Sequence, residues 1–388
     1  MSILFLTLNV ILAIYAFWGA IYQLFFSIAG KFYKTPISKQ ANRLRRIAVF
    51  IPAYKEDAVI VQTVEAALQQ DYPNNQYEVI VIADSLKAET MKRLKKMPVQ
   101  VLGVAFEKST KSKSLKSALN TLRGWNFEIA VVLDADNIMK TDFLNRINNS
   151  FAEGVRVLQG RRVAKNQETG LALLDSASED ANTHILSKGH RALGLSARLA
   201  GSGMAFNYSL FDQNMQKINA IGGFDKELEL RLTQAGEVIR YDDEAIVYDE
   251  KVSYARNFTR QRSRWIAAQF NYAQQFMPTA ISQFILRGSF DFLNKSVQMT
   301  LPPRLILPFV LSSGFLLNYF VSNDLAVLWA IGLASNIVSF ALALPNYCFN
   351  FSNLKMWRQI PIALWATLRA LTQLRNAQRE FIHTVHTI

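Results

Sequence analysis

Two aspartates separated by a single residue, Asp134 and Asp136, are the side chains of this sequence best suited to chemistry. They lie in the run Asp134-Ala135-Asp136-Asn137, which follows an apolar segment at 129–133 with the pattern of a buried strand. Mg²⁺ and Mn²⁺ bind carboxylate oxygens and commonly link them to substrate phosphates. The pair therefore indicates a site for a divalent cation and a phosphorylated ligand, although acids in an ordinary turn produce the same spacing.

Alternating strands and helices must position these acids. The order strand, helix, strand predicts an α/β fold with a parallel sheet and right-handed crossovers. No G-x-G-x-x-G or Walker A loop is present, which argues against a dinucleotide fold or a P-loop ATPase. We expect strands at 47–52, 77–83, 99–104 and 128–133, with helices at 58–70, 89–96 and 114–122 between them. Further along, we expect helices at 169–188 and 227–234, and strands at 238–241 and 245–249.

Polar groups follow each of the expected parallel strands. Pro52-Ala53-Tyr54-Lys55-Glu56 leaves the first strand, Asp84 leaves the second, and a lysine-rich loop at 108–116 follows the third. Ligands of open α/β sheets bind beyond the carboxyl ends of the strands. Acids for a ribose or base, lysines for phosphate and acids for a metal together predict a nucleoside diphosphate site.

The second half of the chain supplies three further motifs. These are Gly201-Ser202-Gly203, the acidic run 225–230 and Gln261-Arg262-Ser263-Arg264-Trp265. On a helix, Gln261, Arg264 and Trp265 share one face. That face offers an amide, a guanidinium for phosphate oxygens and an indole for a sugar ring. The alternative is a cation–π pair on the surface.

In this order and at these spacings, the motifs resemble those of membrane-integrated family 2 glycosyltransferases, the type that includes cellulose, poly-N-acetylglucosamine and hyaluronan synthases. The resemblance implies a GT-A fold, which is an α/β domain with a mixed sheet. It implies an inverting, metal-dependent transfer of a hexosyl or N-acetylhexosaminyl group from a nucleoside diphosphate sugar, with a UDP-sugar as the expected donor. It also implies Mg²⁺ or Mn²⁺ at Asp136. The residues implied to bind substrate are Pro52, Tyr54, Glu56, Asp84, Lys111, Asp134, Gly201, Ser202 and Gly203.

The resemblance also implies individual roles. Glu56 and Asp84 would contact the nucleoside, Lys111 the diphosphate, and Asp134 the ribose or donor sugar. The residues implied to line the place where the pyrophosphate meets the acceptor are Gln261, Arg264 and Trp265.

The catalytic base is the one position where the chain departs from the family pattern. Related enzymes usually have Thr-Glu-Asp or Glu-Asp where this chain has Asp225-Lys226-Glu227. Aligning the leucines at 228 and 230 places Glu227 at the base, which would take a proton from the acceptor hydroxyl. Asp225 and Glu229 remain candidates, and Glu229 could instead lie on the helix surface.

Apolar segments at the two ends of the chain predict membrane spans. Residues 1–30 contain no charged side chain, and 3–28 is long enough to cross a bilayer without the features of a cleaved signal peptide. A block at 305–348 predicts a hairpin of spans at about 305–321 and 325–345, and 360–374 predicts an interfacial helix. The expected organisation is an anchor at 1–30, a cytosolic GT-A domain at 31–277, and interfacial helices with the hairpin at 278–388.

Basic residues orient these spans. A cluster follows the first span without any acid, a second follows the last span, and the turn of the hairpin has none. By the positive-inside rule, the central domain and the C-terminus are expected in the cytoplasm of a multi-pass inner- or plasma-membrane protein. These clusters also explain much of the net charge of +13, so nucleic acid is not an expected partner.

The acceptor has two possible identities at this stage. Gln-x-x-Arg-Trp favours a growing polysaccharide at the membrane, whereas the small number of spans favours single transfer to a membrane lipid, or a channel completed by a partner subunit. A catalytically silent membrane scaffold is the alternative from another class, because a fold does not establish activity.

Overall fold

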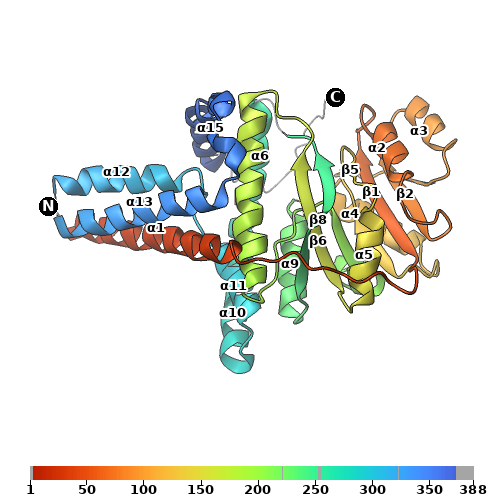
Figure 1. The fold of residues 1–388 in the computed structure, drawn as a ribbon, viewed down its shortest axis with the longest axis horizontal. Helices are drawn as coiled ribbons and strands as arrows, with labels where there is room; N and C mark the ends of the chain where they lie inside the picture. The colour runs from red at the N-terminus through yellow and green to blue at the C-terminus, as the bar shows by residue number, and fades with distance from the viewer. Residues whose placement is uncertain (1–2, 221, 252–254, 322, 373–388) are drawn as a thin grey trace.

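The computed structural model describes residues 3–220, 222–251, 255–321 and 323–372. It consists of an α/β domain around one mixed sheet and a group of long apolar helices that extends away from it (Figure 1). The sheet has eight strands in the order β3-β2-β1-β4-β7-β6-β8-β5. Their bounds are β1 Ile47–Tyr54, β2 Tyr77–Asp84, β3 Gln100–Val104, β4 Ile129–Val132, β5 Ile138–Met139, β6 Val157–Ala164, β7 Met204–Asn207 and β8 Ile239–Asp249.

The first half of the sheet is parallel, as the alternation of strands and helices predicts. β1 pairs in parallel with both β2 and β4, and β2 pairs in parallel with β3. The second half is mixed, because β7 runs antiparallel to both β4 and β6. The α/β fold with a mixed sheet is therefore confirmed.

Both faces of the sheet are buried, which explains the nearly continuous apolar strands. In β1, Ala48 and Phe50 pack into the core on one face, whereas Val49 and Ile51 pack into the core on the other. The helices that cover these faces are α2 Ile60–Ala67, α3 Ala88–Leu94, α4 Lys111–Thr121, α5 Phe143–Ala152, α8 Tyr208–Met215 and α9 Phe224–Gln234.

Three expected elements of the α/β domain differ from those in the structure. The strands expected at 238–241 and 245–249 form one strand, β8, whose pairing with β6 shifts register between Gly160 and Arg161. The helix expected at 169–188 is α6 Gly170–Thr183 followed by a π-helical turn, η1 His184–Gly189, and the short α7 His190–Ala192. A π-helical turn within a helix often lies at a functional or packing site.

That π-helical turn packs closely against α1 Ile3–Gly30. A Cβ atom on Gly189 would lie 2.2 Å from the Phe26 carbonyl oxygen, so only glycine allows this approach. The ring of His184 lies 2.9 Å from the Ser27 carbonyl oxygen, and the Tyr22 hydroxyl lies 3.1 Å from His190 Nε2. The inner end of α1 is thus fixed to the α/β domain.

Three apolar helices lie side by side and project from the α/β domain (Figure 1). They are α1, α12 Leu307–Tyr319 and α13 Asn323–Ala343. In the described part of the chain, α1 and residues 324–343 are long and apolar enough to cross a membrane. The first helix of the expected hairpin is shorter than predicted, since α12 has 13 residues. Such a helix is about 20 Å long, against a hydrocarbon core of about 30 Å.

The remaining helices connect this group to the α/β domain. α10 Ala255–Arg287 contains Pro278, so the domain boundary expected after residue 277 falls inside one helix. The other elements are α11 Phe290–Gln298, the 3₁₀ turns η2 Asn346–Phe349 and η3 Phe351–Asn353, α14 Leu354–Trp357 and α15 Ile360–Thr372. α15 is amphipathic, with Ala363 and Ala366 buried and Trp365 exposed, and it packs against α10.

Candidate active site

The carboxyl ends of the parallel strands form one wall of the site. Tyr54 at the end of β1 pairs with Asp84 at the end of β2. The residues that follow, Lys55 and Ser85, both have positive φ, at 57° and 58°. Strained backbone of this kind in non-glycine residues concentrates at functional sites. Asp84 is buried, and its Oδ2 atom has no hydrogen-bond partner among the described residues, which leaves an acceptor for a ligand.

Lys111, the first residue of α4, connects three parts of the site. Its ammonium group donates to Asp134 Oδ1 and to the Gly201 carbonyl oxygen, the latter at 2.7 Å, and lies 5.2 Å from the centroid of the Phe224 ring. The structure therefore brings together the lysine and the first aspartate that the sequence assigned to a phosphorylated donor.

The second aspartate is held by a buried polar network. In the orientation that satisfies both ends of its amide, Asn137 donates to Asp136 Oδ1 at 2.9 Å and to Asp249 Oδ1 at 3.2 Å. The hydroxyl oxygen of Ser202 is 2.9 Å from that amide and accepts from the Asp134 backbone N–H at 2.9 Å. Asp249 also pairs with Arg162 at 2.7 Å. The loop at 134–137, which we call the acidic loop, is thus fixed in place.

This donor set fits a hard divalent cation that shares its ligands with substrate. Asp134 and Asp136 both line the cavity and offer only oxygen atoms. Within the described ranges, no group of three His, Cys, Asp or Glu side chains converges on one point. The remaining ligands of Mg²⁺ or Mn²⁺ would therefore come from the diphosphate and water, which is the usual arrangement for Mg²⁺.

The glycine motif mainly shapes the acidic loop. Gly201 and Gly203 have φ values of +83° and +64°, and a Cβ on Gly203 would lie 3.0 Å from Val247. Only Gly201 of the three motif residues lines the cavity, whereas Ser202 is fully buried against the acidic loop. Of the described motif residues, Ser202 and Gly203 therefore act through position rather than by contact with a ligand.

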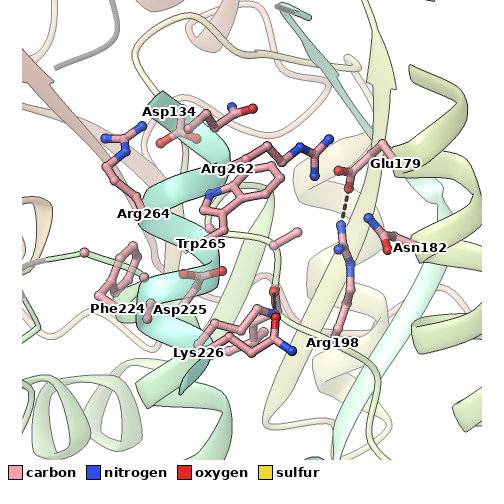
Figure 2. A pocket seen from close by; sticks show the side chains of 18 of the residues that line it. Asp134, Glu179, Asn182, Arg198, Phe224, Asp225, Lys226, Arg262, Arg264 and Trp265 are labelled. Carbon is pink, nitrogen blue, oxygen red and sulfur yellow. Dashed lines mark hydrogen bonds and ion pairs between the residues drawn. The ribbon is translucent and has the colours of Figure 1, made fainter. Parts of the chain in front are cut away.

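Helix α10 forms the opposite wall (Figure 2). Gln261, Arg264 and Trp265 line the cavity, as the helical spacing predicts. Arg262 lines it as well, and its guanidinium lies 4.7 Å from the centroid of the Trp265 ring. In Figure 2, Arg262 and Arg264 extend to opposite sides of the helix, and Arg262 points toward the pair formed by Arg198 and Glu179.

The acidic run of α9 offers one carboxylate to the cavity. Asp225 lines the cavity, and burial raises the pKa of its carboxyl group. Glu227 is absent from the lining residues and is buried, and its Oε1 atom accepts from Arg231 Nε and Nη2 at 2.9 and 2.7 Å. The structure thus places the residue expected as the base outside the cavity, with its carboxylate already bound.

Glu229 does not lie on the helix surface, which corrects that alternative. It is fully buried, accepts from the Leu199 backbone N–H at 2.6 Å and pairs with Lys295 at 3.1 Å. Burial alone would raise its pKa, but Lys226 and Lys295 hold the pKa below its usual range. Glu229 is therefore a structural anion.

One cavity of about 500 Å³ contains these groups. Its outer end is lined by Tyr54, Glu56, Asp84 and Lys111. Its inner end reaches the base of the apolar helices, where the lining residues are Gln23, Leu186, Gln298, Met299, Leu301, Pro302, Pro303, Arg304, Leu305 and Thr367. The cavity therefore connects the carboxyl edge of the sheet to the apolar helices.

Comparison with known proteins defines the class. The family model described as "Glycosyltransferase like family 2" matches residues 45–268, which is more than half of the chain. The protein therefore belongs to this family of glycosyltransferases. This confirms the resemblance drawn from its motifs.

Individual relatives are distant. The beta-monoglucosyldiacylglycerol synthase of Nostoc sp. is 25% identical over 278 residues, covering 68% of this chain and 57% of the relative. The probable glycosyltransferase YdaM of Bacillus subtilis is 25% identical over 240 residues, covering 58% of this chain and 55% of the relative. The chain thus spans little more than half the length of these proteins.

A solved structure shares the fold. The mannosyltransferase PcManGT from Pyrobaculum calidifontis, solved in complex with GDP-Man and Mn²⁺, has a TM-score of 0.59 and 16% identity. The match covers 95% of this chain and 98% of PcManGT. The likeness extends over the apolar helices as well as the α/β domain, and it establishes the GT-A-type fold.

Several residues of the site carry no sequence signal of their own. Arg162, Arg198 and Arg304 come from a strand, a loop and an interhelical segment, and they meet only in the cavity. The same applies to Glu179 and Asp249, which are their acidic neighbours. Isolated charges in amphipathic segments look like surface residues, so only their burial could have identified them.

Proposed function

We propose that this enzyme transfers one sugar from a nucleoside diphosphate sugar to a hydroxyl group of a membrane lipid, with inversion and with a divalent cation. The observation that carries this proposal is the course of the cavity, which begins at Asp84 and Lys111 and ends beside the inner end of α1. A lipid embedded beside the apolar helices could place its head group in this cavity without leaving the bilayer. The name of the Nostoc relative, a glucosyldiacylglycerol synthase, supports the same acceptor class.

The outer end of the cavity would hold the donor. The unpartnered Oδ2 atom of Asp84 is available to accept a hydrogen bond from the nucleoside, with Glu56 nearby on the same wall. Lys111 would neutralise diphosphate oxygens, and Asp134 would bind the ribose or the donor sugar. Asp136 would hold Mg²⁺ or Mn²⁺, which stabilises the negative charge that develops on a leaving diphosphate.

Asp225 is the residue we assign as the general base. It is the carboxylate of the acidic run that lines the cavity, and a raised pKa makes it a stronger base. A Cβ placed on Gly201 would lie 3.9 Å from Asp225 Oδ2, so this carboxylate faces the loop that also contacts Lys111.

The proposed step forms one bond and breaks one. The acceptor oxygen attacks the anomeric carbon and its proton passes to Asp225, while the bond from that carbon to the diphosphate oxygen breaks. The nucleoside diphosphate leaves with the bonding electrons. Arg264 would face the negative charge that develops on the diphosphate, as arginine clamps do at transferring phosphate groups. Trp265 and Gln261 would position the sugar and the acceptor.

The packing of α15 constrains the membrane topology. α15 packs on α10, and Thr367 of α15 lines the same cavity as residues that precede α12. In the proposed arrangement, the chain enters α12 and leaves α13 on the same side of the membrane, so that both helices cross or neither does. With the basic residues of 31–46 and 355–369, this supports a cytoplasmic active site in a multi-pass protein.

A growing polysaccharide is the second candidate acceptor, because Gln261, Arg264 and Trp265 reproduce the Gln-x-x-Arg-Trp motif typical of processive synthases. The two candidates differ in the product. A lipid acceptor yields a lipid with one added sugar, whereas a processive synthase yields a polymer.

The test is to incubate the purified protein in lipid-containing micelles with radiolabelled UDP- and GDP-sugars, in Mg²⁺ or Mn²⁺ and in chelator. We expect label in a lipid extract as a single-sugar product, lost on chelation and in Asp136→Asn. A long polymer would favour the second candidate. If the folded protein binds no nucleotide and transfers no sugar, the catalytically silent scaffold is the hypothesis that remains.

A further inference from the structure

Three guanidinium groups gather at the inner end of the cavity. Arg198, Arg262 and Arg304 all line it, and each interacts electrostatically with the other two. Figure 2 shows Arg198 and Arg262 on the same side of α10, together with Glu179 and Asn182. We call this set of three arginines the inner arginine cluster.

Within the described part of the chain, two arginines of the cluster form ion pairs with carboxylates, and the third does not. Arg198 pairs with Glu179, and Arg262 pairs with Asp175 at 3.0 Å. Among the described residues, Arg304 has no carboxylate within ion-pair distance, and its Nη1 atom is shielded from solvent without a hydrogen-bond partner. The cluster therefore has one uncompensated positive charge.

An uncompensated buried guanidinium is unfavourable unless a ligand completes it. Burial, together with the charges of Arg198 and Arg262, lowers the pKa of Arg304 to about 9, although the charge of Glu179 acts in the opposite direction. Because this value remains above neutral pH, Arg304 stays protonated in the cell and presents a positive charge to the cavity. A bound anion would stabilise a buried positive charge of this kind.

The place of Arg304 restricts where this anion can come from. Arg304 lies between α11 and α12, close to Tyr22 of α1. The neighbouring Pro302 packs so closely on α1 that a Cβ at Gly19 would lie 2.8 Å from its ring. The walls here include the apolar side chains of Met299, Leu301 and Leu305. An anion with an apolar tail fits this end better than a freely soluble one.

We propose that the acceptor is a phospholipid with a hydroxylated head group, and that the inner arginine cluster binds its phosphate, with Arg304 as the principal contact. This proposal rests on the proposed lipid acceptor. Guanidinium groups bind phosphate oxygens through paired donors, which suits them to this ligand. The order along the cavity also agrees, since the head-group hydroxyl would reach Asp225 while the phosphate lies at Arg304 and the acyl chains lie beside α1.

A comparison of two lipids tests this assignment. Transfer by the full-length enzyme is measured in mixed micelles with phosphatidylglycerol, which has a phosphate and a head-group hydroxyl, and with diacylglycerol, which has a hydroxyl and no phosphate. We expect a preference for phosphatidylglycerol. In Arg304→Gln, we expect the KM for phosphatidylglycerol to rise roughly tenfold to 100-fold, the loss typical of a charged hydrogen bond. The kcat and the affinity for the free nucleoside diphosphate should change little.

Two further variants separate binding from folding and from general charge. Arg304→Lys keeps the charge and should retain part of the preference, which covers the case in which Arg304→Gln does not fold. Arg358→Gln removes an exposed charge near the membrane helices, outside the cavity lining, and should leave the KM within about twofold. A loss as large in Arg358→Gln as in Arg304→Gln would overturn the assignment.

The remaining outcomes are equally decisive. Equal use of both lipids, with no effect of Arg304→Gln, would overturn this inference while leaving the lipid acceptor intact. Donor hydrolysis without transfer to any lipid would overturn both. Inorganic phosphate distinguishes the source of the anion: competition with phosphatidylglycerol supports the head group, whereas stimulation of transfer to diacylglycerol would assign the site to free phosphate.

Discussion

The assignment of the catalytic base leads to the sharpest prediction, because two acids of α9 can be exchanged for their amides at nearly constant shape. Asp225→Asn removes the carboxylate that lines the cavity, and Glu227→Gln removes the one bound to Arg231. If Asp225 accepts the proton, its amide should lower kcat by about 10²–10⁴-fold, the usual contribution of a general base. That loss corresponds to roughly 3–5 kcal/mol of activation free energy.

Glu227→Gln should affect stability rather than turnover. The carboxylate accepts two hydrogen bonds from Arg231, and the pair is buried on the glutamate side, with 6% of that side chain exposed against 23% for the arginine. A hydrogen bond to a charged group contributes roughly 1.5–3 kcal/mol, and the glutamine oxygen can keep one as a neutral acceptor. After allowance for solvent at the arginine, we expect the free energy of unfolding to fall by about 1–2 kcal/mol.

The raised pKa of Asp225 also predicts how Asp225→Asn affects the free energy of unfolding, and the direction is opposite to that expected for Glu227→Gln. Burial raises this pKa, so above the folded pKa the ionised carboxylate costs the folded state free energy, and that cost is absent below the unfolded pKa. At neutral pH, Asp225→Asn should therefore be at least as stable as the wild type. For activity, the base must be deprotonated, so kcat/KM should fall on acidification at a higher pH than the ordinary aspartate value of about 3.9.

The assay combines initial rates with thermal melts on the same preparations. Reduced turnover with an unchanged melting temperature in Asp225→Asn, and the reverse in Glu227→Gln, would match the reasoning. The opposite pattern, with Glu227→Gln folded but slower by 100-fold and Asp225→Asn within threefold of the wild type, would show that Glu227 is the base and that the cavity wall is rearranged when substrate binds.

Three further predictions concern the donor site and the helix packing. Asp84→Ala should weaken UDP or GDP binding by roughly tenfold or more in calorimetry, because it removes the free acceptor atom; unchanged affinity would place the nucleoside elsewhere. Ser202→Ala should weaken Mn²⁺ binding and lower stability by about 1–3 kcal/mol, since the Asp134 N–H and the Asn137 amide both lose a partner, and equal metal affinity would contradict its positioning role. Gly189→Ala should destabilise the contact with α1, because the added methyl group meets the Phe26 carbonyl oxygen; a melting temperature equal to that of the wild type would show that the π-helical turn can shift.

Local patterns were sufficient for the first half of the fold. β1, β2 and β4 are buried on both faces, so each appears as a short apolar run that ends in a polar group. Parallel pairing then brings those polar groups to one edge, which is why Asp84 and Asp134 could be placed in one site from their positions alone. The second half could not be derived in this way, because β7 enters the sheet antiparallel between β4 and β6. No local pattern encodes that insertion.

The sequence of α9 does not indicate which of its acidic residues faces the cavity, and the assignment of the general base depends on this. α9 is buried almost all round, from Leu228 to Thr233, so its pattern does not reveal which face meets the cavity. Successive residues of a helix are about 100° apart, and a difference of two positions turns a side chain from one side to the other. Our proposal of Asp225 as the base therefore depends on how the helix packs, whereas alignment of the leucines alone favours Glu227.

The sequence by itself determined the family and predicted the groups at the proposed donor end of the cavity, because their signals reside in short runs of neighbouring residues such as 134–136 and 261–265. Only the tertiary structure shows which residues line the inner end of the cavity, beside the apolar helices. Arg304 is more than a hundred positions from both Arg198 and Glu179 along the chain, and only the packing of α1, α6 and α10 brings them to the same cavity. Charged residues that are far apart in sequence follow no periodic pattern. Only their burial at the same cavity in the folded protein shows that they lie together.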